Sequence, residues 1–139
     1  MEKVYTTVKI AVSMLFSYLF GRFDLLLQLL CLVMAVDFMS GLIVATVFRK
    51  SPKTESGAVA SKAAVKGILR KVCQLLLVAV ITRLSVAVGD DYFCRNTAIL
   101  FFVAGESISI LENMGLMGIA YPEWLKNALE MLRNSKRNK

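Results

Sequence analysis

Residues 101–115 have the sequence FFVAGESISILENMG, an apolar stretch that nevertheless carries two carboxyl groups, Glu106 and Glu112. An α-helix turns by about 100° per residue, so small and polar side chains of this stretch gather on one side: Gly105, Glu106, Ser109, Glu112 and Asn113. A helix retains carboxyl groups within hydrocarbon only where they face protein or water. The stretch therefore predicts that other helices of the chain, or other copies of it, cover this side.

The composition indicates an all-α integral membrane protein with a single membrane domain, residues 1–139. Hydrophobic residues make up 57% of the chain, above the roughly 45–50% of ordinary globular domains, and the mean hydropathy is +0.63. The net charge is +7, but the basic residues flank apolar runs. Such residues are typical of contacts with anionic lipid headgroups, so we expect no nucleic acid partner.

Apolar runs predict three to four transmembrane helices. Residues 25–48 form the strongest candidate, with 24 residues against the roughly 20 that a bilayer requires. Residues 72–88 and 97–114 are the next two. Residues 4–20 are also apolar, but polar side chains form a stripe along one face of this segment: Glu2, Thr6, Lys9, Ser13 and Ser17. The first helix is thus expected either to span the membrane or to lie in its interface.

Two basic segments predict the orientation of the chain in its membrane. In the linker 49–71, Lys62, Lys66 and Arg70 share one helical face and Lys71 adjoins them. This spacing predicts a basic amphipathic helix on the membrane surface. Residues 123–139 predict a short helix with a basic end. The excess of positive charge places both the linker and the C-terminus in the cytoplasm, and a spanning first helix would place the N-terminus there as well.

Three charged residues are predicted at similar depth in the membrane. Counting about 1.5 Å per residue, Asp37 and Glu106 lie near the middle of their spans and Arg83 lies a few residues toward the outer end of its own. We expect Arg83 to pair with Asp37 or with Glu106. Such pairs either lock helices together or become exposed to water when subunits rearrange.

A shallower group is predicted near the cytoplasmic end, where Glu112 and Asn113 are expected to reach Arg70 or Lys71. The candidates for a buried charge network or a pore face are Asp37, Arg83, Glu106, Ser109, Glu112 and Asn113. The chain has three cysteines without a CxxC spacing and no histidine. No catalytic, cofactor or metal site is predicted from these residue types.

Several motifs resemble the phage holin family, which includes holin-like proteins beside clostridial toxin genes. Asp37 and Gly41 lie late in a span, and a basic linker with Ser61, Gly67 and Lys71 precedes the next span. The closing pattern ESISILEN at 106–113 carries most of the resemblance, together with residues that follow it: Gly115, Pro122, Leu125 and Leu129.

The resemblance implies a protein without enzymatic activity that forms homo-oligomers among membrane lipids. Its lesions would release an endolysin, or a toxin, without necessarily binding it. A small proton-coupled transporter that titrates Glu106 or Asp37 is the alternative, and a membrane anchor that recruits a partner through the basic linker is a third class.

Overall fold

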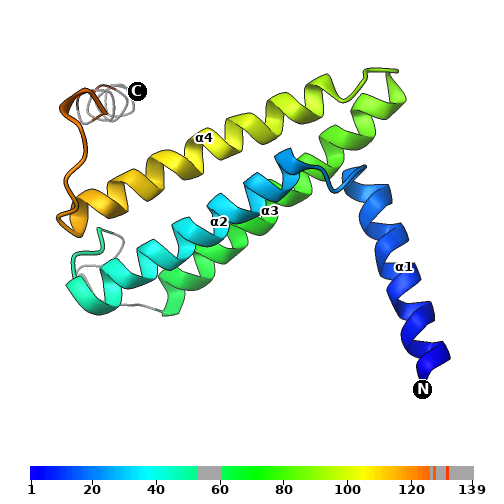
Figure 1. Cartoon of the computed structure of the whole chain (residues 1–139), viewed down its shortest axis with the longest axis horizontal. Coiled ribbons are helices and arrows are strands. Elements are labelled where there is room, and N and C mark those ends of the chain that lie inside the picture. Colours follow the sequence, from blue (N-terminus) through cyan, green and yellow to red (C-terminus); the bar gives the residue numbers. More distant parts are fainter. Residues whose placement is uncertain (53–60, 126, 128–130, 132–139) are drawn as a thin grey trace.

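A computed structural model describes residues 1–52, 61–125, 127 and 131, which are helical apart from the connections (Figure 1). The described residues contain no strand. The elements are α1 (Glu2–Phe20), α2 (Leu25–Ile43), the π-helical turn η1 (Val44–Phe48), α3 (Ser61–Ala87) and α4 (Phe93–Leu116). Helical residues at Glu123–Leu125 follow α4, and most of the predicted tail helix lies outside the described residues.

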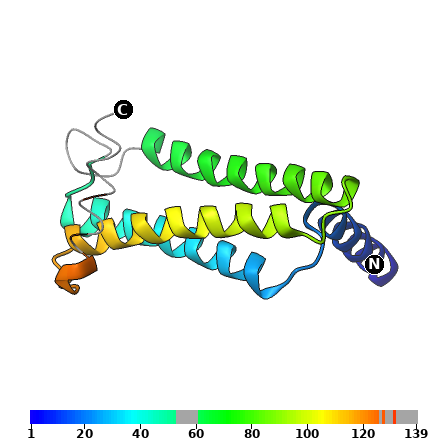
Figure 2. The ribbon, with the colours of Figure 1, turned by 90° about the horizontal axis from the view of Figure 1, so that it is seen from above.

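α2, α3 and α4 form a three-helix bundle. α4 packs most extensively against α2 and also against α3, whereas α3 contacts α2 sparsely. Figure 2 shows α3 and α4 running side by side to the short connection that joins them. The core lies toward that end of the bundle and consists of five buried residues: Leu27, Leu30, Met34, Val78 and Ile99. α1 joins the bundle only at this end.

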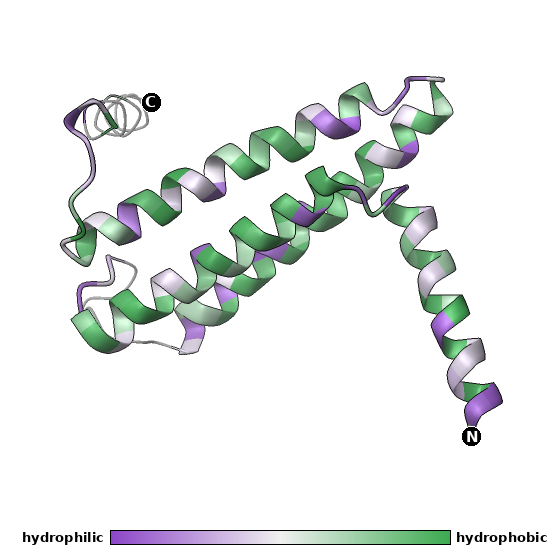
Figure 3. Cartoon of the chain, in the orientation of Figure 1, coloured by the Kyte–Doolittle hydropathy of each residue, from purple (hydrophilic) through white to green (hydrophobic). Residues whose placement is uncertain are grey.

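Much of the outer surface is apolar. Figure 3 shows hydrophobic residues along all four helices, and large side chains such as Leu32, Leu76 and Phe101 are exposed. Two described helices are long and apolar enough to cross a membrane, Leu25–Phe48 and Phe93–Leu116. An apolar surface of this extent is unfavourable in water, and it suits a protein surrounded by lipid.

Local signals explain where the helices begin and end. The Asp24 carboxylate accepts a hydrogen bond from the Leu27 backbone N–H at 3.0 Å and caps α2. At the start of α4, Asp90 lies two residues before the N-cap residue Tyr92, and its carboxylate accepts from the backbone N–H of Phe93 at 3.0 Å and of Cys94 at 2.8 Å. Arg49 has φ 50° and ends the second helix in a left-handed conformation.

α2 and η1 together make residues 25–48 helical, and the other helices differ in their bounds from the predicted segments. α3 is one helix of 27 residues, with no boundary between residues 71 and 72, where the hydropathy pattern predicts a change from a surface helix to a span. No proline interrupts this stretch, so the backbone has no reason to break there. α4 extends beyond 97–114 at both ends. Residues 53–60 of the predicted linker lie outside the described part of the chain.

Candidate functional site

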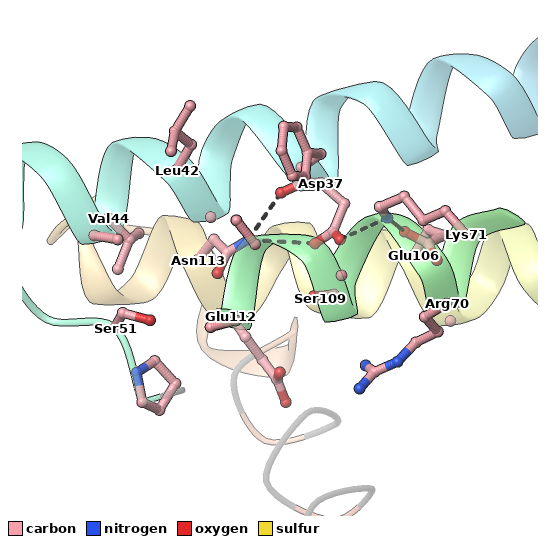
Figure 4. A pocket seen from close by; sticks show the side chains of 18 of the residues that line it. Asp37, Leu42, Val44, Ser51, Arg70, Lys71, Glu106, Ser109, Glu112 and Asn113 are labelled. Carbon is pink, nitrogen blue, oxygen red and sulfur yellow. Dashed lines mark hydrogen bonds and ion pairs between the residues drawn. The ribbon is translucent and has the colours of Figure 1, made fainter. Parts of the chain in front are cut away.

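A buried charge network joins the three bundle helices. Lys71 on α3 reaches Asp37 on α2, with 2.8 Å between its Nζ and Asp37 Oδ2, and it also forms an ion pair with Glu106 Oε2 on α4 (Figure 4). The exposed fractions of the three side chains are 16% for Lys71, 11% for Asp37 and 7% for Glu106. One ammonium group therefore binds two carboxyl groups in a site that is largely shielded from its surroundings.

Asn113 extends this network along the contact between α4 and α2. Its Nδ2 donates to Ser40 Oγ at 2.8 Å and to Asp37 Oδ1 at 3.3 Å. Ser40 in turn donates its hydroxyl to the Asp37 backbone carbonyl at 3.0 Å. Ser40, Asp37 and Asn113 are all buried. These polar contacts fix α2 against α4 independently of α3.

A cavity of about 370 Å³ lies beside the network, between α2, α3 and α4. Its polar lining includes Arg70, Gln74, Ser109 and Glu112 in addition to the network residues. The Gln74 Oε1 atom is buried and has no hydrogen-bond partner among the described residues. The cavity is partly open, since the exposed residues Arg70 and Glu112 also line it. The bundle thus has a partly polar hollow beside the charge network.

The predicted pairing of Arg83 is wrong. Arg83 donates from Nη1 to the Tyr18 backbone carbonyl at 3.3 Å, and its guanidinium carbon lies 4.2 Å from the centre of the Tyr18 ring. Lys71 takes the place that was predicted for Arg83. The two residues are separated by about 18 Å along α3, at about 1.5 Å per residue, so only one of them can reach the carboxyl groups.

The shallower group is arranged differently from the prediction. Asn113 bonds to α2 rather than to Arg70 or Lys71. Glu112 is exposed, Ser109 is half-buried, and both line the cavity. Figure 4 shows Arg70 and Glu112 pointing to the same side of the network. Ser109, Glu112 and Arg70 are thus grouped around one space, although they form no part of the hydrogen-bonded network described above.

Lys62, Lys66 and Arg70, the basic face predicted for the linker helix, are exposed, but Lys71 points the other way, into the bundle. The sequence contained a pattern that indicates this inward position of Lys71. Lys71 shares a helical face with polar or buried residues at intervals of three or four along α3: Gln74, Val78, Thr82 and Ser85. The adjacent basic stripe obscured it.

A second cluster, centred on Arg95, holds the other end of the bundle. Arg95 is 1% exposed. Its guanidinium binds both carboxylate oxygens of Asp24, at 2.8 and 3.2 Å. It also donates to the backbone carbonyls of Phe20 and Arg22, each at 3.0 Å, and to Asn96 Oδ1 at 2.9 Å. Arg95 therefore ties the end of α1, the start of α2 and the start of α4 together.

Sequence reasoning did not identify this cluster. Asp24 directly precedes an apolar run, which is typical of a helix cap, but nothing local connects it with Arg95. Burial acts to raise the pKa of the Asp24 carboxyl, but hydrogen bonds from Arg95 and from the Leu27 N–H, with the Arg95 charge, outweigh this effect and lower that pKa. The ionised, paired form is thus the stable one.

The helices, the apolar exterior and the enclosed polar network define a small all-helical membrane protein. Its sequence matches the bacteriophage holin family over residues 14–134, and the chain belongs to this family. No solved structure matches it.

Three uncharacterized relatives illustrate the similarity. A protein of Listeria monocytogenes is 37% identical over 115 residues, covering 83% of this chain and 76% of the relative. A 14.9 kDa protein in the nagH 3' region of Clostridium perfringens is 32% identical, covering 98% of this chain and all of the relative. The Bacillus subtilis protein YtkC is 25% identical, covering 88% and 86%.

Proposed function

We propose that this protein acts as a holin: it collects in the bacterial cytoplasmic membrane, oligomerises and forms lesions that release an endolysin or a toxin. Family membership supports a holin-type role. The observation that carries the proposal is the polar network of Lys71, Asp37 and Glu106, enclosed by helices whose outer surfaces are apolar. A bundle built in this way is stable in lipid as a single copy. Its interior polar side chains can face water when several copies assemble.

The mechanism follows from the unequal packing of the helices. α2 and α4 are held together by an extensive interface and by Asn113, whereas α3 contacts α2 sparsely and is joined to both by Lys71. When copies collect, α3 swings away from α2 and α4, and the polar faces turn toward water between subunits. Lys71, Glu106 and Ser109 then line the lesion. The released protein passes through without a specific binding site, and no substrate is converted.

The proposed orientation places the basic beginning of α3 and the C-terminus in the cytoplasm. α2, α3 and α4 each cross the membrane in this arrangement. α3 carries Arg70, Lys71 and Arg83, but Lys71 is paired inside the bundle and Arg83 is bound near the opposite end. Its charges therefore lie either within protein or close to a membrane surface.

The test is expression in bacteria together with a cytoplasmic cell-wall hydrolase. We expect an abrupt loss of membrane potential, followed by release of the hydrolase and lysis. Glu106→Gln leaves Lys71 with a single carboxylate, which makes the buried group neutral and lowers the gain from exposing it to water. This variant should insert normally but lyse later, with an altered distribution of oligomers. Glu123→Gln, at an exposed position after the end of α4, is the matched control.

A small proton-coupled transporter is the second candidate, because Asp37 and Glu106 border the cavity. A transporter would produce a solute flux that depends on the pH gradient while the membrane potential persists. Retention of the hydrolase in intact cells that contain abundant protein would refute the holin function. A pH-dependent flux in the same cells would then favour transport.

A further inference from the structure

α1 has almost no part in the bundle. Residues 1–15 are all exposed, and only the last turns of the helix touch the core, through the half-buried rings of Phe16 and Phe20. In Figures 1 and 2, α1 leaves the end of the bundle where α2 and α4 begin and runs steeply across the direction of the other helices. A fourth spanning helix would instead run alongside them.

Two arginines fix this departure of α1. Arg83 on α3 donates to the Tyr18 carbonyl at 3.3 Å and lies over the Tyr18 ring. Arg95 on α4 donates to the Phe20 and Arg22 carbonyls, each at 3.0 Å. The last turn of α1 is thus held from two different helices, and its direction is set by these contacts.

The charge pattern of α1 suits a membrane surface better than a span. Lys9 lies near the middle of this 19-residue helix, and the contact of its ammonium group is with the Tyr5 ring, 4.3 Å away on the same helix. A lysine at the centre of a bilayer costs on the order of 2.5–3.5 kcal/mol on insertion scales. A helix lying in the interface keeps Lys9 in the headgroup region and avoids this cost.

The surface of α1 has a polar side and an apolar side. One side carries Thr6, Lys9, Ser13 and Ser17, and large apolar side chains such as Val8 are exposed elsewhere around the helix. The two lysines of the helix outnumber its single acid. This excess complements anionic lipid headgroups.

We propose that α1 lies along the outer surface of the membrane, against anionic lipid headgroups, and that the N-terminus is outside the cell. The inference rests on the proposed orientation, in which the basic beginning of α3 is cytoplasmic. α2, α3 and α4 are then the three spans, and the N-terminus and C-terminus lie on opposite sides. α1 serves as a lipid-bound arm, attached to the bundle through Arg83 and Arg95.

Cysteine labelling in intact cells tests this arrangement. The native cysteines, Cys31, Cys73 and Cys94, are first replaced by alanine. Single cysteines are then introduced by Glu2→Cys and Ser13→Cys in α1. Variants are compared at equal abundance in the membrane fraction, and a membrane-impermeant maleimide is added before or after permeabilisation.

Two reference positions report the sides of the membrane, Asp91→Cys in the α3–α4 connection and Lys50→Cys after η1. Val12→Cys, the neighbour of Ser13 on the apolar side, is the matched control for burial in lipid. We expect Glu2→Cys, Ser13→Cys and Asp91→Cys to react in intact cells. Lys50→Cys should react only after permeabilisation, and Val12→Cys should react more slowly than Ser13→Cys.

Three results would overturn the proposal. Reaction of Glu2→Cys only after permeabilisation would show that α1 spans the membrane. Protection of Ser13→Cys while Glu2→Cys reacts would show that the polar side of α1 does not face the aqueous side of the interface. Reaction of Lys50→Cys, but not of Asp91→Cys, in intact cells would show that the chain has the opposite orientation in the membrane. None of these measurements depends on lysis, so failure of holin activity is detected separately.

Discussion

Replacement of Lys71 by methionine removes a cation that, in the described part of the chain, forms ion pairs with both Asp37 and Glu106. Methionine has a similar length and no charge, so the change tests the charge rather than the packing. The variant leaves two carboxyl groups facing each other in a site where their exposed fractions are 11% and 7%. We expect a large loss of stability, because the buried Glu106 carboxylate loses its ion pair with Lys71 and lies near a second carboxylate.

The magnitude can be worked from the geometry. At the 2.8 Å separation of Lys71 Nζ and Asp37 Oδ2, and with an effective dielectric constant near 20, the attraction amounts to about 6 kcal/mol. Desolvation of both ions offsets most of this value. Removal of one partner leaves the desolvation uncompensated, which typically lowers the free energy of unfolding by about 3–5 kcal/mol.

Reversible unfolding in detergent micelles, followed by circular dichroism during titration with sodium dodecyl sulfate, measures this change. Lys66→Met removes an exposed charge from the same helix and should alter the free energy of unfolding by no more than about 0.5 kcal/mol. Adding Asp37→Asn and Glu106→Gln to Lys71→Met should recover most of the lost stability. A loss below about 1 kcal/mol for Lys71→Met, or no recovery in the triple variant, would refute the reasoning.

Three further predictions concern the cluster at the other end of the bundle and the glycines, and the same titration measures them. Arg95→Lys should lower the free energy of unfolding by about 2 kcal/mol, because lysine cannot reproduce the forked contact with Asp24 together with the carbonyl contacts; an unchanged value would contradict the assigned role. Burial tends to raise the pKa of Asp24, but the Arg95 and Leu27 hydrogen bonds lower it below the ordinary 3.8. The stabilisation from the Asp24 carboxylate is therefore full above about pH 3.8 and is lost as the pH falls through the lower pKa of the folded state. Asp24→Asn should remove this dependence of the free energy of unfolding on acid pH. Gly21→Ala should lower the free energy of unfolding by about 1–2 kcal/mol, because Gly21 has φ 72° and an added Cβ would lie 3.0 Å from the Tyr92 ring. Gly105 lies within α4, where an added Cβ meets open space. Gly105→Ala should therefore leave the free energy of unfolding unchanged or raise it by up to about 1 kcal/mol.

Hydropathy and helical period were sufficient to predict much of the architecture. The length of the apolar run determines residues 25–48, because one bilayer-length helix satisfies its own backbone hydrogen bonds. The cost of isolated carboxyl groups predicted that one of Asp37 and Glu106 is paired within the chain and that the other is neutral or paired across a subunit contact. In the structure, both form ion pairs with Lys71. Both inferences depend on properties of one segment or one side chain, which a single sequence contains.

The partner of these carboxyl groups depends on properties that the sequence contains only indirectly. Depth along each helix favoured Arg83, but the rotation of α3 about its axis decides which side chain faces α2 and α4, and this rotation places Lys71 inward. Arg95 and Asp24 are 71 residues apart, and their contact depends on how three helix ends meet. No local propensity specifies such a meeting.

The two charged clusters differ in what they allow to move. Arg95 binds Asp24 and two backbone carbonyls at one end of the bundle. A short connection also joins α3 and α4 at this end. Several independent contacts therefore hold these helix ends in place. At the opposite end, α3 is joined to both α2 and α4 through Lys71 and otherwise borders a cavity. Under the proposed holin function and orientation, release of the Lys71 ion pairs would let α3 pivot about its outer end, and a lesion formed in this way would open first toward the cytoplasm. It follows that substitutions at Arg95 should mainly lower stability, whereas substitutions at Glu106 should mainly change the time at which the membrane is opened.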